Sequence, residues 1–276
     1  MATQLSFVWF VWKNLCRRRL HTALTLVGIG MGICAFTAQA ADARAVLAAS
    51  RERVQTADYR IVGRLVRMDA NGTRTSDNIS IKAHWFPGVL RVLLDVNAPV
   101  AAREHVLLEM RPNGDDAIFI AHPGDRSPSP LPFSRWGDGP LGSTFSYEDY
   151  LEPQYFWPVQ TEFQETRRGA RDCIVVKSVP GPASHTHYAE ERTWLDKTIG
   201  FPVYAEKTPK GSAATKQFTY FGLRHDQGVW SASQVEVKMS GKNGSTLLIV
   251  DRGTARAHLG PNDFSPASMV RFQGGS

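Results

Sequence analysis

Residues 234–250 carry the pattern that decides the fold class: Gln-Val-Glu-Val-Lys-Met, then Ser-Gly-Lys-Asn-Gly, then Ser-Thr-Leu-Leu-Ile-Val. In Gln234–Met239 polar and apolar residues alternate strictly, as they do in a strand with one buried face. Residues 240–244 are turn formers, and the apolar run Ser245–Val250 is typical of a second strand. The stretch therefore predicts a β-hairpin, and similar stretches occupy most of the chain.

Short strand-like runs separated by turn residues recur from Tyr59 onward. Asp69–Gly72 and Pro112–Asp116 both contain Asn-Gly, a strong hairpin signal. The other expected strands are Tyr59–Arg67, Ile79–Trp85, Val89–Leu94, His105–Met110, Ala117–Ala121, Cys173–Val179, Thr193–Leu195, Val203–Glu206, Gln217–Phe221 and Val229–Trp230. Strands do not alternate with helices, so the sequence predicts an antiparallel sheet, open barrel or sandwich and disfavours a parallel nucleotide-binding sheet.

One amphipathic helix is expected before the first strand, over Asp42–Val54, with Asp42 as its N-cap. Its shared face at helical spacing comprises Ala43, Val46, Leu47, Ser50 and Val54. Farther along, the Pro- and Gly-rich Gly124–Leu141, with Phe133 and Trp136 in it, is expected to be a long loop that crosses the mouth of a single domain. Ser146 followed by Asp149 resembles the start of a short capped helix.

The N-terminal segment has the three parts of an export signal. A positive cluster, Lys13–Arg19, precedes the apolar run Ala23–Phe36 and then Ala38-Gln-Ala40, which predicts cleavage after Ala40. The alternative is an uncleaved anchor over Leu20–Ala40, long enough to span a bilayer, with the positive cluster on the cytoplasmic side. Either way we expect residues 1–40 to direct export and residues 41–276 to form the folded domain, in the periplasm or anchored at the inner membrane.

Charge and cysteine content exclude two classes of protein. Four of the 32 Lys and Arg residues lie in residues 1–40, which hold no acid, so the remainder is nearly neutral against 26 Asp and Glu. A nucleic-acid binder would keep a basic face in its folded domain. Only Cys173 follows the N-terminal segment, so an internal disulfide is impossible there, and we expect this cysteine to be a small buried hydrophobe.

The N-terminal segment also resembles a known family. Residues from about 12 to 36, with Asn14-Leu15, an Arg triplet and Leu24-Thr-Leu-Val-Gly-Ile29, resemble the first span of MacB-type ABC transporter permeases. None of the later permease spans is present, so the chain is not expected to be a permease itself. The resemblance favours the anchored alternative, in which the protein is an interaction subunit beside an ABC transporter permease.

A second resemblance covers nearly all of residues 41–270. The motifs that carry it are Ala40–Leu47, the strand from Tyr59 toward Asp69–Gly72, Gly142-Ser-Thr-Phe-Ser-Tyr-Glu-Asp-Tyr150, Glu191-Arg-Thr-Trp-Leu-Asp196, Phe201-Pro-Val203 and Asn262–Ala267. In this order they resemble the LolA-like periplasmic "outer membrane lipoprotein-sorting protein" family. The resemblance implies a strongly curved antiparallel sheet, an unclosed half-barrel, with a helix over its concave side. It also implies that the concave face binds acyl chains and that the protein carries lipids or lipoproteins toward the outer membrane.

Aromatic residues in strands are the candidates for lining such an acyl-binding cavity: Trp85, Phe86, Phe119, Trp194, Phe218, Tyr220 and Trp230. A metal-dependent hydrolase is the competing enzymatic hypothesis, with His185 and His187 as ligands beside Glu190 and Glu191. The preceding Pro180-Gly-Pro182 favours an exposed hairpin for these histidines instead. Hydrolase and phosphate-binding signatures are missing from the sequence. We therefore expect a binding protein with no catalytic residues, no metal and no cofactor.

Overall fold

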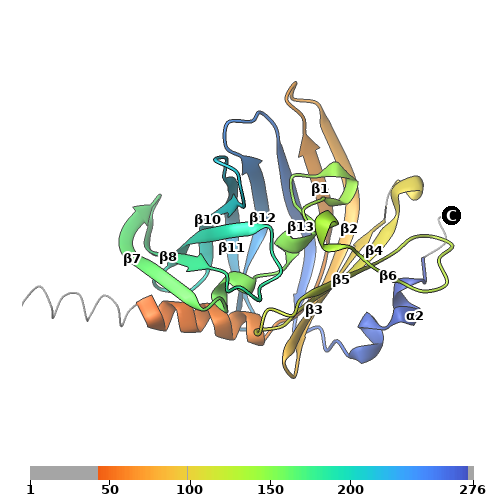
Figure 1. Cartoon of the computed structure of the whole chain (residues 1–276), viewed down its shortest axis with the longest axis horizontal. Helices are drawn as coiled ribbons and strands as arrows, with labels where there is room; N and C mark the ends of the chain where they lie inside the picture. The colour runs from red at the N-terminus through yellow and green to blue at the C-terminus, as the bar shows by residue number, and fades with distance from the viewer. Residues whose placement is uncertain (1–42, 98, 273–276) are drawn as a thin grey trace, which may run out of the picture. The chain divides into compact units, whose positions relative to one another are not determined.

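The computed structural model describes residues 43–97 and 99–272, which contain one 13-stranded antiparallel sheet (Figure 1). The strand order is β6-β5-β4-β3-β2-β1-β13-β12-β11-β10-β9-β8-β7. The strands are β1 Asp58–Met68, β2 Arg74–Phe86, β3 Val89–Val96, β4 Glu104–Met110, β5 Ala117–Ala121, β6 Ser129–Pro130, β7 Val159–Arg168, β8 Arg171–Val179, β9 Tyr188–Asp196, β10 Pro202–Pro209, β11 Lys216–Asp226, β12 Val229–Met239 and β13 Ser245–Ala255. The mainly β fold class with one open antiparallel sheet, predicted from the sequence, is confirmed.

Nearly every pair of neighbouring strands is a hairpin of consecutive strands. The exception is β1 with β13, whose register runs from Tyr59 opposite Ala255 to Met68 opposite Ser245. The sheet therefore consists of two meanders joined along the β1–β13 pair. It is not closed, because β6 and β7 lie at opposite edges and each pairs with a single strand.

Residues 131–158, here called the crossing segment, connect the two edge strands and run over the sheet between them (Figure 1). The Thr144 backbone N–H donates to Thr246 Oγ1 of β13 at 2.8 Å, and Tyr147 OH donates to Glu104 of β4 at 2.9 Å. Short 3-10 helices make up much of this segment: Phe133–Arg135, Pro140–Gly142, Tyr147–Tyr150 and Pro153–Tyr155. The predicted long loop across the domain is confirmed, and it extends farther than the sequence indicated.

The helix at residues 43–55 has the predicted buried face, since Ala43, Val46, Leu47, Ser50 and Val54 are all buried. Ser50 Oγ donates to the Gly200 carbonyl at 2.8 Å. Arg53 Nη2 pairs with Glu152 Oε1 of the crossing segment at 2.6 Å. These contacts hold the helix against β10 and the crossing segment.

A C-terminal segment packs on β3, β4 and β5. It contains the 3-10 helix Pro261–Phe264 and the short helix α2 Pro266–Met269. Its apolar residues form a buried cluster with Leu93, Leu107 and Ala121, namely Leu259, Phe264 and Met269. The Asp58 carboxylate accepts from the His258 and Leu259 backbone N–H groups at 2.9 and 3.1 Å, which fixes the start of the segment.

The strand prediction was wrong in three places. Strand β7 was not predicted, because its sequence is mostly polar and it is an edge strand with mainly exposed residues. Strand β6, two residues long, lies inside the predicted loop. Val229–Trp230 and Gln234–Met239 form one strand, β12, because the small polar residues between them continue the ladder with β11.

The signal peptide, the membrane anchor and the Asp42 cap remain predictions, since they fall outside the described residues. No helix within residues 43–97 and 99–272 is long and apolar enough to cross a membrane. Cys173 is fully buried in β8, as expected for a small hydrophobe.

Candidate functional site

A cavity of about 880 Å³ lies between the second half of the helix and the central strands of the sheet. Its walls come from β1, β2, β3, β11, β12 and β13, with Phe201 before β10 and residues of the crossing segment also in the lining. The apolar side chains that line it are Ile61, Ile81, Leu90, Val92, Phe145, Phe201, Phe218, Val235, Leu248 and Val250. A mainly apolar space of this size, open at one end, is typical of a small-molecule binding site.

The structure brings three of the seven candidate aromatic residues to this cavity, Phe218, Tyr220 and Trp230. The other four lie elsewhere among the described residues. Trp85 stacks on Phe156 of the crossing segment at 5.9 Å. Phe86 and Phe119 pack against the C-terminal cluster, and Trp194 packs edge-on against Tyr204.

A cluster of four buried charged side chains, here called the buried charge cluster, lies at the inner end of the cavity: Asp149, Glu191, Lys207 and Lys216. Lys216 Nζ lies 2.7 Å from Asp149 Oδ2, and Lys207 Nζ lies 3.2 Å from Asp149 Oδ1. Lys207 Nζ also lies 3.7 Å from Glu191 Oε2. The Asp149 side chain is 0% exposed, so it is the centre of a network cut off from solvent.

Further hydrogen bonds complete the network around Asp149. Tyr188 OH donates to Asp149 Oδ1 at 2.7 Å, and the Ser146 backbone N–H donates to Asp149 Oδ2 at 2.8 Å. The predicted cap of a short helix is therefore present, at Tyr147–Tyr150. The same carboxylate also neutralises two lysines from β10 and β11, a role that sequence analysis missed.

Burial acts in the same direction on the two carboxylates of the cluster, but the lysines overcome it at only one of them. Burial alone would raise the pKa of Asp149, but Lys216 and Lys207 overcome it and hold that pKa well below the usual range. Burial raises the pKa of Glu191 to about 7, against the opposing effect of Lys207. Asp149 is thus charged at neutral pH, whereas Glu191 changes its charge near neutral pH.

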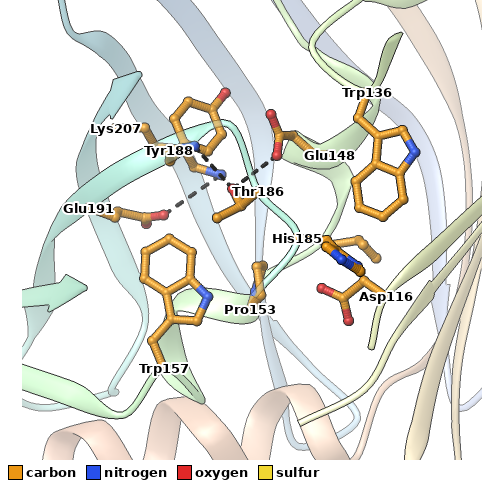
Figure 2. Close-up of a pocket in the computed structure, with 11 residues that line it drawn as sticks. Asp116, Trp136, Glu148, Pro153, Trp157, His185, Thr186, Tyr188, Glu191 and Lys207 are labelled. Carbon is orange, nitrogen blue, oxygen red and sulfur yellow. Dashed lines mark hydrogen bonds and ion pairs between the residues drawn. The ribbon is translucent and has the colours of Figure 1, made fainter. Parts of the chain in front are cut away.

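A second, much smaller cavity of about 10 Å³, room for a single water molecule, lies beside the cluster. Figure 2 shows Glu191 and Lys207 paired on one side of it and His185 beside Asp116 on the other. Burial raises the pKa of Asp116 to about 6. The Glu148 carboxylate accepts from Thr186 Oγ1 at 3.0 Å and lies 3.1 Å from His187 Nδ1.

His187 stacks on Phe133 of the crossing segment with ring centroids 4.3 Å apart, and His185 is exposed. Among the residues that the structure describes, no group of three or more His, Cys, Asp or Glu side chains is arranged to hold a metal ion. The histidine pair therefore joins the crossing segment to the loop before β9, and the arrangement lends no support to a hydrolase.

Replacing Glu191 with glutamine is expected to remove a pH dependence of stability. The folded-state pKa of about 7 lies above the ordinary 4.5, so the stabilising effect of the protonated form is full below about pH 4.5. That effect is lost as the pH rises through about 7, because the folded protein then gives up a proton that the unfolded chain has already lost. From pH 5 to pH 8 the free energy of unfolding of the wild type should fall relative to E191Q by about 3 kcal/mol at most.

Urea unfolding at several pH values measures this difference. The control is Glu165→Gln, because Glu165 is an exposed carboxylate of β7 paired with Lys197. Parallel pH profiles for the wild type and E191Q would show that Glu191 does not titrate in this range.

Comparisons with known proteins found one family model and several solved structures with a similar fold. A family model described as "Uncharacterized protein" matches residues 90–271. No curated protein matches the sequence. Among solved structures, a domain described as an outer membrane lipoprotein-sorting protein from Vibrio parahaemolyticus superposes with a TM-score of 0.73 and 18% identity, over 83% of this chain and 100% of that one.

Two further structures have the same fold. A DUF1329 family protein from Desulfovibrio piger has a TM-score of 0.73 and 14% identity, over 82% of this chain and 98% of that one. A LolA superfamily protein from Nitrosomonas europaea has a TM-score of 0.61 and 11% identity, over 82% and 98% of the two chains. The fold implied by the LolA-like motifs is therefore confirmed, whereas no comparison supports the resemblance to MacB-type permeases.

Proposed function

Since the chain belongs to the family whose model matches residues 90–271 and has the LolA-superfamily fold, we propose that it binds acyl chains of lipids or lipoproteins in the 880 Å³ cavity. The observation that carries this proposal is the cavity itself, which lies between the helix and the curved face of an unclosed sheet. An open sheet of this kind can hold an elongated apolar ligand against one helix.

The driving force for binding is burial of the hydrocarbon. Each methylene moved from water into the cavity contributes about 0.8 kcal/mol, so ten of them contribute about 8 kcal/mol before the cost of association. Phe218, Tyr220 and Trp230 are the aromatic residues proposed to contact the chain. Phe145, Phe201 and the aliphatic residues of β12 and β13 extend the same apolar surface.

One feature of the cavity favours a carrier over an enzyme. Charged groups at the inner end of the cavity are engaged with one another, as Asp149 with its two lysines and Arg53 with Glu152. Such pairs hold the walls in place, and they engage the charged side chains of Asp149, Arg53 and Glu152 that line this end. The cavity is therefore suited to bind an apolar ligand by burying it.

The proposed place of action is the periplasm, with transfer toward the outer membrane as the proposed direction. The signal-like residues 1–40 and the lipoprotein-sorting description of the Vibrio parahaemolyticus domain support this location. The second candidate, an anchored subunit beside an ABC transporter, would need the same N-terminal segment to remain uncleaved.

The test is co-purification. The full chain is expressed with its own N-terminal segment in a Gram-negative bacterium, purified without detergent and analysed for lipid by denaturing mass spectrometry. Acyl-bearing material at near-stoichiometric amount is the expected result. Protein that is folded, empty and unable to take up a fluorescent fatty acid would overturn the proposal.

A further inference from the structure

Exposed residues of the cavity lining gather at the turn between β11 and β12, namely Arg224, His225, Asp226 and Gly228, and this part of the cavity is here called its open end. Gln227 and Gly228 both have left-handed backbone conformations, with φ of 49° and 80°. Two such residues in a row make the tight hairpin turn whose twist matches that of the strands. Phe218, near the buried charge cluster, is eight residues before Asp226 at this turn, or roughly 26 Å along the strand. The cavity therefore runs from the inner end, where Phe218 lies near the buried charge cluster, to the turn.

Two arginines project at this turn. Arg224 and Arg256 both line the cavity and both are exposed. The Arg256 guanidinium lies over Gly228, since a Cβ added to that glycine would sit 3.4 Å from Arg256 Nη2. Within residues 43–97 and 99–272, neither arginine has an ion-pair partner, whereas the third arginine of the lining, Arg60, lies 3.6 Å from Asp263.

Arg256 also has a left-handed backbone, with φ of 52°, which is unfavourable for a residue with a Cβ. A conformation of this kind costs on the order of 1 kcal/mol and persists where the surroundings require it. Here the left-handed conformation of Arg256, the residue directly after β13, turns its side chain back toward the β11–β12 turn. The two guanidinium groups are thus gathered at one place from two different strands.

A carboxylate is present at the same end. Asp226 at the turn lines the cavity, is exposed and has no cationic partner among the described residues. The unpaired charged groups described at the open end are therefore two cations and one anion. A ligand headgroup that satisfies both kinds carries an anionic group and a cationic group together.

We propose that the open end binds the headgroup of a zwitterionic phospholipid with a primary ammonium group. Arg224 and Arg256 hold the phosphate, because the planar guanidinium fork matches two phosphate oxygens. Asp226 accepts hydrogen bonds from the ammonium group. This inference rests on the proposed function, since the acyl chains of the same lipid would occupy the apolar part of the cavity.

The experiment is a competition among lipids with identical acyl chains. Full-length protein is incubated with vesicles of equimolar dioleoyl phosphatidylethanolamine, dioleoyl phosphatidylglycerol and dioleoylglycerol, then separated from them, and its bound lipid is quantified by mass spectrometry. Phosphatidylethanolamine should be enriched about fivefold to tenfold over dioleoylglycerol, a difference of about 1 kcal/mol. Phosphatidylglycerol should be bound less well than phosphatidylethanolamine, because Asp226 repels an anionic headgroup that has no ammonium.

Substitutions at the turn between β11 and β12 test whether its residues cause the lipid preference. The double substitution Arg224→Gln and Arg256→Gln should bring the ratio of phosphatidylethanolamine to dioleoylglycerol close to that of the vesicle. Asp226→Asn should remove the preference over phosphatidylglycerol. The matched control is Arg252→Gln, an exposed arginine of the same strand end as Arg256 that does not line the cavity. This control should keep the wild-type ratios.

Different failures point to different conclusions. Wild-type protein that extracts the three lipids in the vesicle ratio would overturn the headgroup site and leave acyl binding standing. Protein that extracts no lipid at all would overturn the proposed function itself. Displacement of the lipid by soluble phosphoethanolamine at an equal concentration would assign the turn to a free phosphate ester and would also overturn the proposal.

Discussion

Replacing Val235 with tryptophan is expected to reduce the lipid bound to the purified protein at least tenfold. Val235 lines the cavity, where it pairs across the sheet with Tyr220 of β11 and Leu248 of β13. An indole at this position occupies the middle of the space that an acyl chain would fill. Losing even two methylenes of burial costs about 1.6 kcal/mol, or more than a factor of ten in affinity. Bound lipid per protein, measured by denaturing mass spectrometry, gives the result directly.

The neighbouring residue supplies the control. Gln234 is exposed and does not line the cavity, because successive side chains of a strand point to opposite faces. Q234W therefore adds the same side chain to the same strand without entering the cavity, and it should retain wild-type lipid. Both variants should unfold within about 1 kcal/mol of the wild type, since the indole of V235W enters open space rather than a filled core. Equal lipid content in the two variants would contradict the assignment of the cavity as the acyl site.

Replacing Asp149 with asparagine is expected to cost about 3–5 kcal/mol of stability, the largest effect of any single polar substitution considered. The amide has the same shape but no charge, so Lys207 and Lys216 would be buried without their shared counterion. The Asp149 charge also makes the stability of the folded protein depend on pH in acid. Because the folded-state pKa of Asp149 is held far below the unfolded value of about 3.9, its contribution is full above that value and is lost as the pH falls below it.

Urea unfolding gives the free energy of unfolding of D149N and of the control Asp251→Asn. The difference between the two losses of stability measures how much burial strengthens an aspartate–cation pair. Asp251 pairs with Arg64 at 2.8 Å, but both side chains are substantially exposed, so its loss should cost less than about 1 kcal/mol. The acid denaturation of D149N should also begin from a lower stability and be shallower than that of the wild type. A cost for D149N as small as that for D251N would mean that the two lysines lose their charge or reach solvent in the variant.

The hairpins of the fold could be predicted because their information is local. Asn-Gly in Asp69–Gly72 and Pro112–Asp116 ends one strand and starts the next within a few residues, and both turns are present. Strand β7 could not be found this way, because an edge strand with exposed residues needs no alternating apolar pattern. Its position is set by pairing with β8 and by the crossing segment that leads into it.

The candidate site was only partly predictable because a strand sequence does not say which face lines a cavity. Phe218 and Tyr220 lie on the cavity side of β11, while Trp194 of β9 is a similar aromatic residue that packs elsewhere. The buried charge cluster was missed for a different reason. Asp149 and its partners Lys207 and Lys216 are about 60 residues apart and meet only when the crossing segment lies on the sheet. One signal was available: each lysine has an apolar residue two positions away on the same face of its strand, Ala205 for Lys207 and Phe218 for Lys216.

The pairing of β1 with β13 also has a consequence for the order in which the chain can fold. As the chain emerges from the ribosome, β1 to β6 can form hairpins early, but the second neighbour of β1 in the sheet, β13, is the last strand to be made. Until then β1 is an unpaired edge, which is a site for aggregation or for a chaperone. The cavity spans this same junction, with β1 on one side and β11 to β13 on the other. A bound acyl chain would therefore contact both the half of the sheet that is synthesised first and the half that is synthesised last. Binding of the chain would stabilise the complete sheet, and the complete sheet would bind the chain more tightly.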